Sequence, residues 1–556
     1  MANDVTVIKP QAPRVPMAAQ PWDYRANLVG EIATWQPPLT SADNDIRPGF
    51  ELNKARARDL ALSNPYAANS VEILRDAVVG KKFMLALAPD YEDLGVSIEA
   101  ADEWVGIVER EWERYAEGIT FDADASRKNS FTFLMHQAMA GLHMEGEALG
   151  TIEAKRGQHG YMTCLNLIEP ERLDNFHQVQ SPFAANGNQV RYGVERDKQG
   201  EPIAYHIREA HEHEAYWQGG RRSMQVQRVL RYNGAGRPQV LHVHDQARPN
   251  MTRGVSTAML STLKSMKMLG TFSDAELSRQ IQSASWAAVV ETELNYDQAM
   301  QLLARGGSLA GDGTSGNTLT DYAVDHLRNV APYYSAAGMM YNGSRIVHMV
   351  PGEKLKIVQS NLQGAQFDMF TKAVLRELAA GLNVSFETLT RDYSNLSYAA
   401  ARVSMEEIWR RYLRIRQLLT QQLGLPFFSA WLEEAIKIKR VPMLGRFKPD
   451  AAGWQRAKHM LCRGEFISWG RPIIDPVKER TGQGLALAMG LTTLRDEAAG
   501  DGADWQANLK QRKREAQLRE ELDLNPTGVD PTLVVGGNAK AGNPQEGRKA
   551  RKDGEG

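Results

Sequence analysis

The chain has 556 residues, of which 42% are hydrophobic and 24% are charged, and its formal net charge is −1. This composition is typical of a folded globular protein, and the length allows about two to four domains with a large core. The near-zero net charge argues against a protein that coats DNA by neutralising phosphates, since such surfaces are rich in lysine and arginine, so any contact with nucleic acid would be local or weak.

The cysteines and the chain ends narrow the class of protein further. Cys164 and Cys462 are the only two cysteines and lie far apart, which favours a reducing compartment without a disulfide framework. The N-terminus lacks the pattern of a signal peptide, and no uninterrupted apolar run reaches the length that spans a bilayer. Residues 1–21 and 525–556 are rich in proline, glycine or charge with few large apolar groups, and we expect disordered tails there.

The first half of the chain changes from helical to β-rich. Residues 51–80 predict two helices, broken at Asn64-Pro65 and closed by Gly80. Residues 98–116 carry apolar groups at helical spacing, and residues 129–149 continue the helical pattern. From about Leu149 to Asp245 the apolar runs are short and broken by Gly, Asn and Pro, and "DKQGEP" predicts a turn between two strands.

The second half is mainly helical. Residues 254–284 predict one helix about 45 Å long, and residues 362–382 predict another. Between them, residues 286–358 are mixed and Gly-rich, with one helix expected near 296–305 and a strand near 344–350. A polar stretch at 383–396 precedes a helix from about 397 to 423, and most of the remainder is helical. The fold class is therefore α+β, mainly helical.

No catalytic constellation emerges from the sequence. "GDGTSG" at 311–316 matches a dinucleotide motif, but no buried strand precedes it, which favours a loop. The histidines could suggest a metal site, although surface and strand positions explain them better: they are His206, His211, His213, His242 and His244. Asp475 with Glu479 lacks a partner acid, so Asp475 is interpreted as a helix start. A P-loop, G-x-S-x-G and H-E-x-x-H are all absent, and we expect neither an enzyme nor a cofactor or metal.

An ordered set of segments nevertheless resembles one family. It includes "ARARDLALSNPYAANSVEILRDAVVGKKF", "MHQAMAGLHMEGEALG", "GVERDKQGEPIAYHI", "VLHVHDQARPNMTRGVSTAM" and "DYSNLSYAAARVSMEEIWRRY". Together they are similar to the lambda-type portal proteins of tailed bacteriophages, over roughly residues 20–525. The resemblance implies a ring, usually of about twelve copies, at one vertex of the capsid.

The resemblance also implies a division of the chain into named parts. These are a wing at 22–250, a first stem helix at 254–284, a clip at 286–358, a second stem helix at 362–382, a tunnel loop at 383–396, a long helix and return to the wing at 397–470, and a crown at 471–524. The implied partners are double-stranded viral DNA in the channel, the terminase large subunit, a head-tail adaptor, and the major capsid and scaffold proteins, without a membrane. The implied location is the virion, with the host cytoplasm during assembly.

The implied tunnel loop is the candidate functional site. It should point into the channel at its narrowest place, where strong phosphate contacts would stall moving DNA. Its candidate residues are Glu387, Arg391, Asp392, Tyr393, Ser394 and Asn395, a nearly neutral set. An ordinary surface loop is the alternative for this segment. For the whole chain the alternatives are a DNA-processing enzyme of phage assembly, against which the missing P-loop argues, and a membrane pore.

The helix after this loop has two expected features. Ala399, Ala400 and Ala401 would allow close packing against neighbouring copies, and an apolar stripe would face the core. The stripe consists of Met405, Ile408, Trp409, Tyr412, Ile415 and Leu419.

Overall fold

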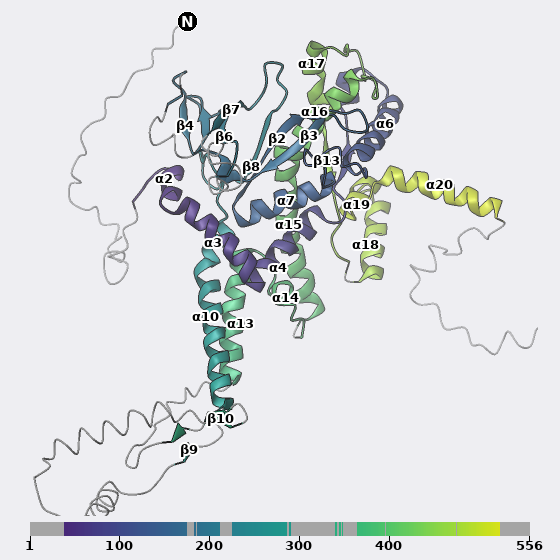
Figure 1. Ribbon diagram of the computed structural model, residues 1–556. Coiled ribbons are helices and arrows are strands. Elements are labelled where there is room, and N and C mark those ends of the chain that lie inside the picture. Colours follow the sequence, from purple (N-terminus) through teal and green to yellow (C-terminus); the bar gives the residue numbers. More distant parts are fainter. Residues whose placement is uncertain are drawn as a thin grey trace, which may run out of the picture.

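The protein is a mainly helical α+β structure whose body carries a long helical hairpin that projects away from it (Figure 1). This fold class agrees with the prediction. The computed structural model describes residues 38–174, 183–184, 186–211, 225–285, 364–394, 396–473 and 475–522, and short strands between 289 and 348. The predicted tails at 1–21 and 525–556, the helix expected near 296–305, the motif at 311–316 and His213 lie outside the described residues.

The N-terminal helices begin and end at signals that the sequence supplies. Asn64 accepts hydrogen bonds from the N–H groups of Tyr66 (3.0 Å) and Ala67 (3.2 Å), and Pro65 opens the next helix, so the expected break is confirmed. Gly80, at φ +63°, ends the second helical stretch, as predicted. The elements are α2 (Ala42–Ile46), α3 (Phe50–Ser63), α4 (Pro65–Leu74), a π-helical turn (Arg75–Val79), α5 (Tyr91–Leu94), α6 (Ile98–Ala116) and α7 (Phe131–Met144), with 3-10 turns at Arg47–Gly49 and Pro170–Arg172.

The β-rich region forms two antiparallel sheets, with strand orders β3-β2-β8 and β4-β5-β6-β7. The expected "DKQGEP" turn lies between β5 and β6, where Asp197 accepts from the N–H groups of Gln199 and Glu201 and Gly200 adopts φ +94°. The strands are β2 (Glu147–Ala154), β3 (Thr163–Ile168), β4 (Gln189–Arg191), β5 (Val194–Arg196), β6 (Pro202–Arg208), β7 (Val226–Leu230) and β8 (Val240–His244).

The main core is centred on Trp112 of α6. Its ring lies 5.1–5.4 Å from the rings of Phe131, Phe428 and Trp431, all in edge-on contacts. These rings come from α6, α7 and α16 (Leu425–Lys437), so segments some 300 residues apart share one core. Strand β1 (Met84–Leu87) pairs antiparallel with β13 (Gly464–Ile467) beside it, which fastens the C-terminal part of the chain to the N-terminal part.

One long, interrupted helix runs through the body. Helix α15 (Tyr398–Leu419) continues through a π-helical turn (Thr420–Gly424) into α16. The π turn fits tightly, since a Cβ on Gly424 would lie 2.8 Å from the Phe466 ring. The predicted apolar stripe is confirmed from Ile408 onward: Tyr412 and Leu419 belong to the main core, and Ile408, Trp409 and Ile415 pack against it. Met405, which we also assigned to the stripe, is half-buried and is not part of this packing.

Helices α10 (Thr257–Ser285) and α13 (Gly364–Leu382) form the hairpin that extends below the body in Figure 1. They correspond to the helices expected at 254–284 and 362–382. At the far end lie the short strands β9 (Val289–Val290), β10 (Met340–Tyr341), β11 (Ser344–Arg345) and β12 (Val347–His348). The rest of 286–358 lies outside the described residues.

Four further helices follow α16 in the chain; the first contributes to the main core, and the last three lie to the side of the body (Figure 1). They are α17 (Ala451–Leu461), α18 (Pro476–Ala488), α19 (Leu494–Gly500) and α20 (Trp505–Glu521). Asp475 accepts from the N–H of Lys478 at the start of α18, which confirms its interpretation as a helix start. Helices α18 and α20 contain no buried residue in the single chain.

The hairpin leaves the body where two glycines face each other. A Cβ on Gly254 would lie 2.0 Å from the carbonyl oxygen of Gly146, and one on Gly146 would lie 2.1 Å from the backbone of Val255. Gly146 also adopts φ +90°. The start of the hairpin therefore lies directly against the backbone that leads into β2.

We expect Gly254→Ala to lower the free energy of unfolding by about 1–3 kcal/mol, because backbone atoms would have to move apart. Gly482→Ala is the matched control. A Cβ there would meet nothing within 4 Å in the middle of α18, so the change should be neutral or stabilise by up to about 1 kcal/mol. Denaturant unfolding of the two variants measures the difference, and equal effects would contradict the tight contact.

Candidate functional site

The base of the candidate loop is folded. Helix α13 ends at Leu382, and the Asn383 side chain donates to the carbonyl oxygen of Gly381 (2.9 Å) while its backbone adopts φ +59°. Gly381 lies against α10, since a Cβ there would be 2.4 Å from Thr262 Cγ2. The chain therefore leaves the hairpin at a fixed point and in a fixed direction.

A short helix, α14 (Phe386–Thr390), occupies the middle of the segment that we expected to be a loop from 383 to 396. Ser385 caps it by accepting from the N–H of Thr388 at 3.1 Å. Val384 and Leu389 are 5% and 2% exposed and belong to a core cluster with residues of α4, α10 and α13. Residues 383–390 are therefore anchored at Val384 and Leu389, which pack between the hairpin and α4, while the other six residues are half-buried.

The exposed part of the segment is a short tip after Arg391. Arg391 adopts φ +58° and ends α14. Asp392 then accepts from the N–H (3.1 Å) and hydroxyl (2.5 Å) of Ser394, and these bonds lower the pKa of Asp392. The Tyr393 side chain is 58% exposed. We call residues 392–396 the tip, in which Asn395 lies outside the described residues.

The predicted site residues therefore separate into two groups. Glu387 is half-buried in the first turn of α14, where a carboxylate suits the positive end of the helix dipole. Arg391, Asp392, Tyr393 and Ser394 follow one another at the end of α14 and in the tip. Beyond the tip, Ser397 caps α15 by accepting from the N–H of Ala400 at 3.3 Å, and Ala399 and Ala400 are exposed in the single chain.

One residue that contacts this segment was missed from the sequence. Asn69, on α4, donates from Nδ2 to the carbonyl oxygens of Thr388 (3.2 Å) and Leu389 (2.9 Å), and its Oδ1 accepts from Arg391 at 3.4 Å. About 320 residues separate it from these partners. Its position within a helical pattern gave no signal for such a contact.

A buried ionic cluster lies where the hairpin joins the body. Glu147 of β2 has no exposed side-chain surface, and both of its oxygens accept from Arg253 at 2.6–3.0 Å. Lys54 of α3 and His242 of β8 (2.9 Å) also bind Glu147. Burial raises the pKa of Glu147, but Arg253 and Lys54 outweigh it, so the pKa lies well below the usual range of a glutamate.

Arg253 extends this cluster to other elements. It donates to the carbonyl oxygens of Tyr192 (2.8 Å) and Pro170 (2.8 Å), and the following N–H, of Gly254, donates to Glu147 at 3.1 Å. The cluster thus joins α3, both sheets and the residues that lead into α10. His242 and His244, which we interpreted as strand residues, are indeed on β8, with no metal role implied by their contacts.

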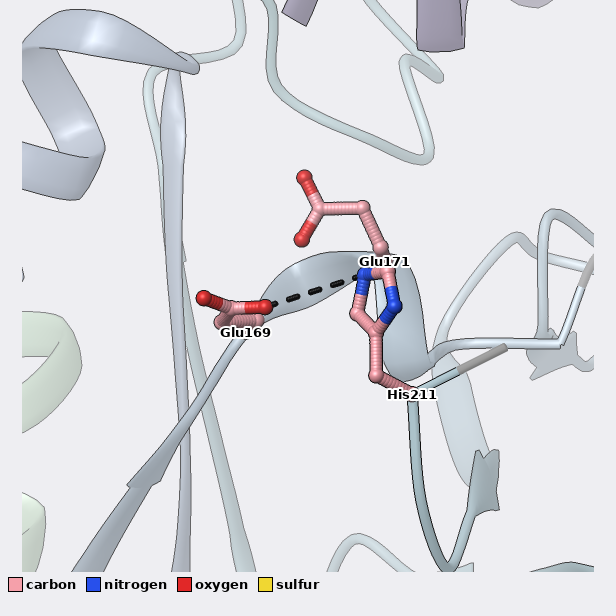
Figure 2. A group of neighbouring side chains, drawn as sticks. All are labelled: Glu169, Glu171 and His211. Atoms are coloured by element: carbon pink, nitrogen blue, oxygen red, sulfur yellow. Dashed lines mark ion pairs between the residues drawn. The ribbon is translucent and has the colours of Figure 1, made fainter. Parts of the chain in front are cut away.

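A second cluster contains two carboxylates and a histidine within 4.8 Å of one another: Glu169, Glu171 and His211 (Figure 2). Such ligand types suit a metal ion. However, the Arg58 guanidinium lies 2.7 Å from Glu171 and 2.6 Å from Glu145, and it supplies positive charge at the same place. His211 approaches Glu169 at 3.8 Å. The arrangement therefore fits an ion-pair cluster.

Over the part of the chain that the structure describes, none of the helices combines the length and the apolarity that a membrane crossing requires. Cys164 and Cys462 are both free.

A family model and the sequence relatives found by comparison with known proteins all describe phage portal proteins. Residues 30–416 match the model of the family described as "Phage portal protein, lambda family". The chain is 31% identical to the portal protein of Escherichia phage N15 over 89% of this chain and 90% of that protein. It is 29% identical to portal protein B of Escherichia phage lambda over 89% of each.

Solved structures give a weaker likeness. The virion of a native gene transfer agent particle contains a chain that is 12% identical, with a TM-score of 0.35, over 88% of this chain and 95% of that one. The neck of an empty particle gives 13% identity and a TM-score of 0.36, over 85% and 93%. The family assignment rests on the sequence relatives.

We expect Glu147→Gln to lower the free energy of unfolding by about 3–5 kcal/mol, because Lys54 and Arg253 would remain buried without their counter-charge. The loss should depend on pH. The folded pKa of Glu147 is depressed, so its stabilisation is complete above the unfolded pKa of about 4.5 and is lost as pH falls towards the folded value. The variant should accordingly lose less stability than the wild type between neutral pH and pH ~3.

Thermal and denaturant unfolding at several pH values measure both effects. Glu103→Gln, on the exposed face of α6, is the matched control and should stay within about 0.5 kcal/mol of the wild type. A parallel pH dependence in Glu147→Gln and wild type would show that this carboxylate does not govern acid stability.

Proposed function

The chain belongs to the lambda family of phage portal proteins, and from this premise we propose how its structure serves that function. Portal proteins are structural components of the virion at the capsid vertex, and this chain functions as one. We propose that about twelve copies form a ring with a central channel. Double-stranded viral DNA would pass through this channel during packaging and ejection.

The proposed partners follow the proposed division of the chain. The wing (22–250 with 397–470) and crown (471–524) would face the capsid shell and interior, where the major capsid and scaffold proteins bind. The clip (286–358), at the far end of the stem helices, would bind first the terminase large subunit and then a head-tail adaptor. Assembly would take place in the host cytoplasm before the ring becomes part of the virion.

The main support for a ring comes from the apolar side chains that are exposed on the hairpin. Helices α10 and α13 pack against each other, yet large apolar side chains on both remain 52–64% exposed in the single chain. They are Met268, Leu277 and Ile281 on α10, and Met369 and Phe370 on α13. Exposed apolar groups on a projecting element mark a surface that another chain covers.

The positions of these groups on α10 suit a ring. Nine residues separate Met268 from Leu277, which places them on roughly opposite sides of the helix. A subunit in a ring has one neighbour on each side, so a helix in the middle of the wall must bury two faces. We infer that the hairpins of adjacent copies pack side by side and form the wall of the channel.

The tip would then face the DNA. Asp392, Tyr393 and Ser394 are polar or aromatic, and the nearby cations are partly paired: Arg391 donates to Asn69, and Lys372 of α13 pairs with Asp368 and lies close enough to interact with Asp392. A tip with few unpaired cations binds phosphate weakly, which permits movement in both directions. Residues 383–390 would support the tip from behind, since they pack against α4 and the hairpin.

We expect Leu277→Glu with Ile281→Glu to prevent ring formation and leave folded single subunits, because each subunit would bring two carboxylates into the interface, where they would lose water without a counter-charge. Mass photometry and negative-stain imaging without detergent measure the assembly. Leu277→Met with Ile281→Met, which keeps apolar side chains of similar volume at the same two positions, is the control and should still form rings. Rings from the glutamate variant would contradict the packing of adjacent hairpins.

We expect Glu387→Lys with Asp392→Lys to form rings and capsids but to package or eject DNA poorly. In a ring of about twelve copies, two sites and two charge units per site change the charge by about +48, which creates a phosphate trap. Higher salt should partly restore movement. Asp392, which lies in the tip, should account for more of the effect than Glu387, which lies in the first turn of α14.

Glu407→Lys, an exposed position on α15 with the same change of charge, is the matched control and should package normally. Packaging is measured as DNA protected from nuclease in assembled capsids, and ejection as release of that DNA. Normal packaging and ejection by the assembled double variant would mean that these residues do not face the DNA.

A further inference from the structure

The end of α14 is held by a side chain from another helix. The last carbonyl groups of a helix lack partners within it. Two of those in α14, of Thr388 and Leu389, accept from Asn69 Nδ2 at 3.2 and 2.9 Å. The opposite atom of the same amide, Oδ1, accepts from Arg391 at 3.4 Å. One half-buried asparagine therefore binds both the end of the helix and the residue at which the chain turns.

The turn itself needs such support. Arg391 adopts φ +58°, a left-handed conformation that costs an L-residue with a side chain roughly 1 kcal/mol. Asn69 contacts the backbone before this turn and the side chain at it. Contacts from Asn69 on α4 thus fix the direction in which the chain leaves α14.

Helix α4 is in turn fixed to the body. Ser70, the next residue, contacts His143 Nε2 of α7 at 3.0 Å, and both side chains are buried. Burial, with a smaller effect of Arg411, lowers the pKa of His143 to about 4, so this histidine is neutral near pH 7. The contacts therefore run without interruption from α7 through α4 to the end of α14.

Among the described residues, the tip beyond Arg391 makes no hydrogen bond to another long helix, and Lys372 of α13 affects Asp392 only through its charge. The hydrogen bonds of residues 392–394 are internal to the tip, to Thr390, or to Leu396. The next fixed point is the Ser397 cap of α15. The tip is therefore held on one side by the hydrogen bonds of Asn69 to the end of α14 and on the other side by the Ser397 cap of α15.

We propose that Asn69 is a positioning residue that sets the direction of the tip and transmits the position of α4 and α7 to it. The local part of this inference depends only on the contacts above. Its consequence for DNA rests on the proposed function, in which the tip lines the channel. The two parts are tested by separate measurements.

The local test uses a spin label in the tip. Ser394→Cys provides an exposed thiol, whereas Cys164 is buried and burial raises the pKa of Cys462 to about 12, so both native thiols react slowly. Asn69→Asp keeps the volume of the side chain but replaces the donor to Thr388 and Leu389 with a carboxylate that repels their oxygens. Electron paramagnetic resonance of assembled rings reports the mobility of the label, and amide hydrogen exchange reports residues 388–392.

We expect Asn69→Asp to increase label mobility and to speed exchange at Leu389–Asp392 about tenfold, as loss of these hydrogen bonds implies. Rings should still assemble, because Val384 and Leu389 remain in their apolar cluster. Asn53→Asp, the same chemical change on the neighbouring α3, should leave the label and the exchange unchanged. Asn69→Gln, which retains the amide donor, should lie between Asn69→Asp and the wild type.

Unchanged mobility and exchange in Asn69→Asp would overturn the inference, as would an equal change in Asn53→Asp. The second measurement is retention of packaged DNA by assembled capsids. A loss of retention of at least about threefold in Asn69→Asp, without a change in the thermal unfolding temperature, supports positioning over a general structural role. A changed tip with normal retention would leave the local inference intact and instead contradict the proposal that the tip lines the channel.

Discussion

The structure depends on the buried carboxylate of Glu147 and the two cations that surround it. A carboxylate without surface exposure is unstable unless it is paired and fully hydrogen-bonded, and Arg253, Lys54, His242 and the N–H of Gly254 meet this requirement. These partners come from α3, β8 and the residues that lead into α10, so a change in the angle between hairpin and body would disturb the charge balance. The ionic cluster thus links the orientation of the hairpin to the body.

The apolar core joins helices that lie far apart in the sequence and holds one end of α15. Trp112 and the rings around it join α6, α7 and α16, while β1 and β13 pair although about 380 residues separate them in the sequence. Arg416 of α15 is buried beside this core and donates to the carbonyl oxygens of Val78, Ala77 and Trp469, and burial lowers its pKa to about 10. The core thereby holds the long helix at one end, and the other end leads to the tip.

Local signals in the sequence predicted many of these elements. Asn64-Pro65, Gly80, "DKQGEP" and Asp475 each act through neighbouring backbone, so a turn or cap could be read without knowledge of the fold. The short helix α14 was missed although Ser385 caps it, because its few residues gave no periodic pattern. Asn69 and Glu147 could not be identified, since their partners lie about 320 and 106 residues away and depend on how helices cross.

Helix α15 joins the core to the tip. Its 22 residues extend about 33 Å from the π turn at Thr420–Gly424, which lies in the core, to Tyr398 next to the tip. The side chains that pack in or against the core begin at Ile408, so about ten residues, roughly 15 Å of helix, lie between this packing and the tip. A bend of about 12° in that segment would move Tyr398 through roughly 3 Å without disturbing the packing around Trp431, and in a ring whose tips line the channel this is close to the spacing of about 3.4 Å between phosphates along one DNA strand.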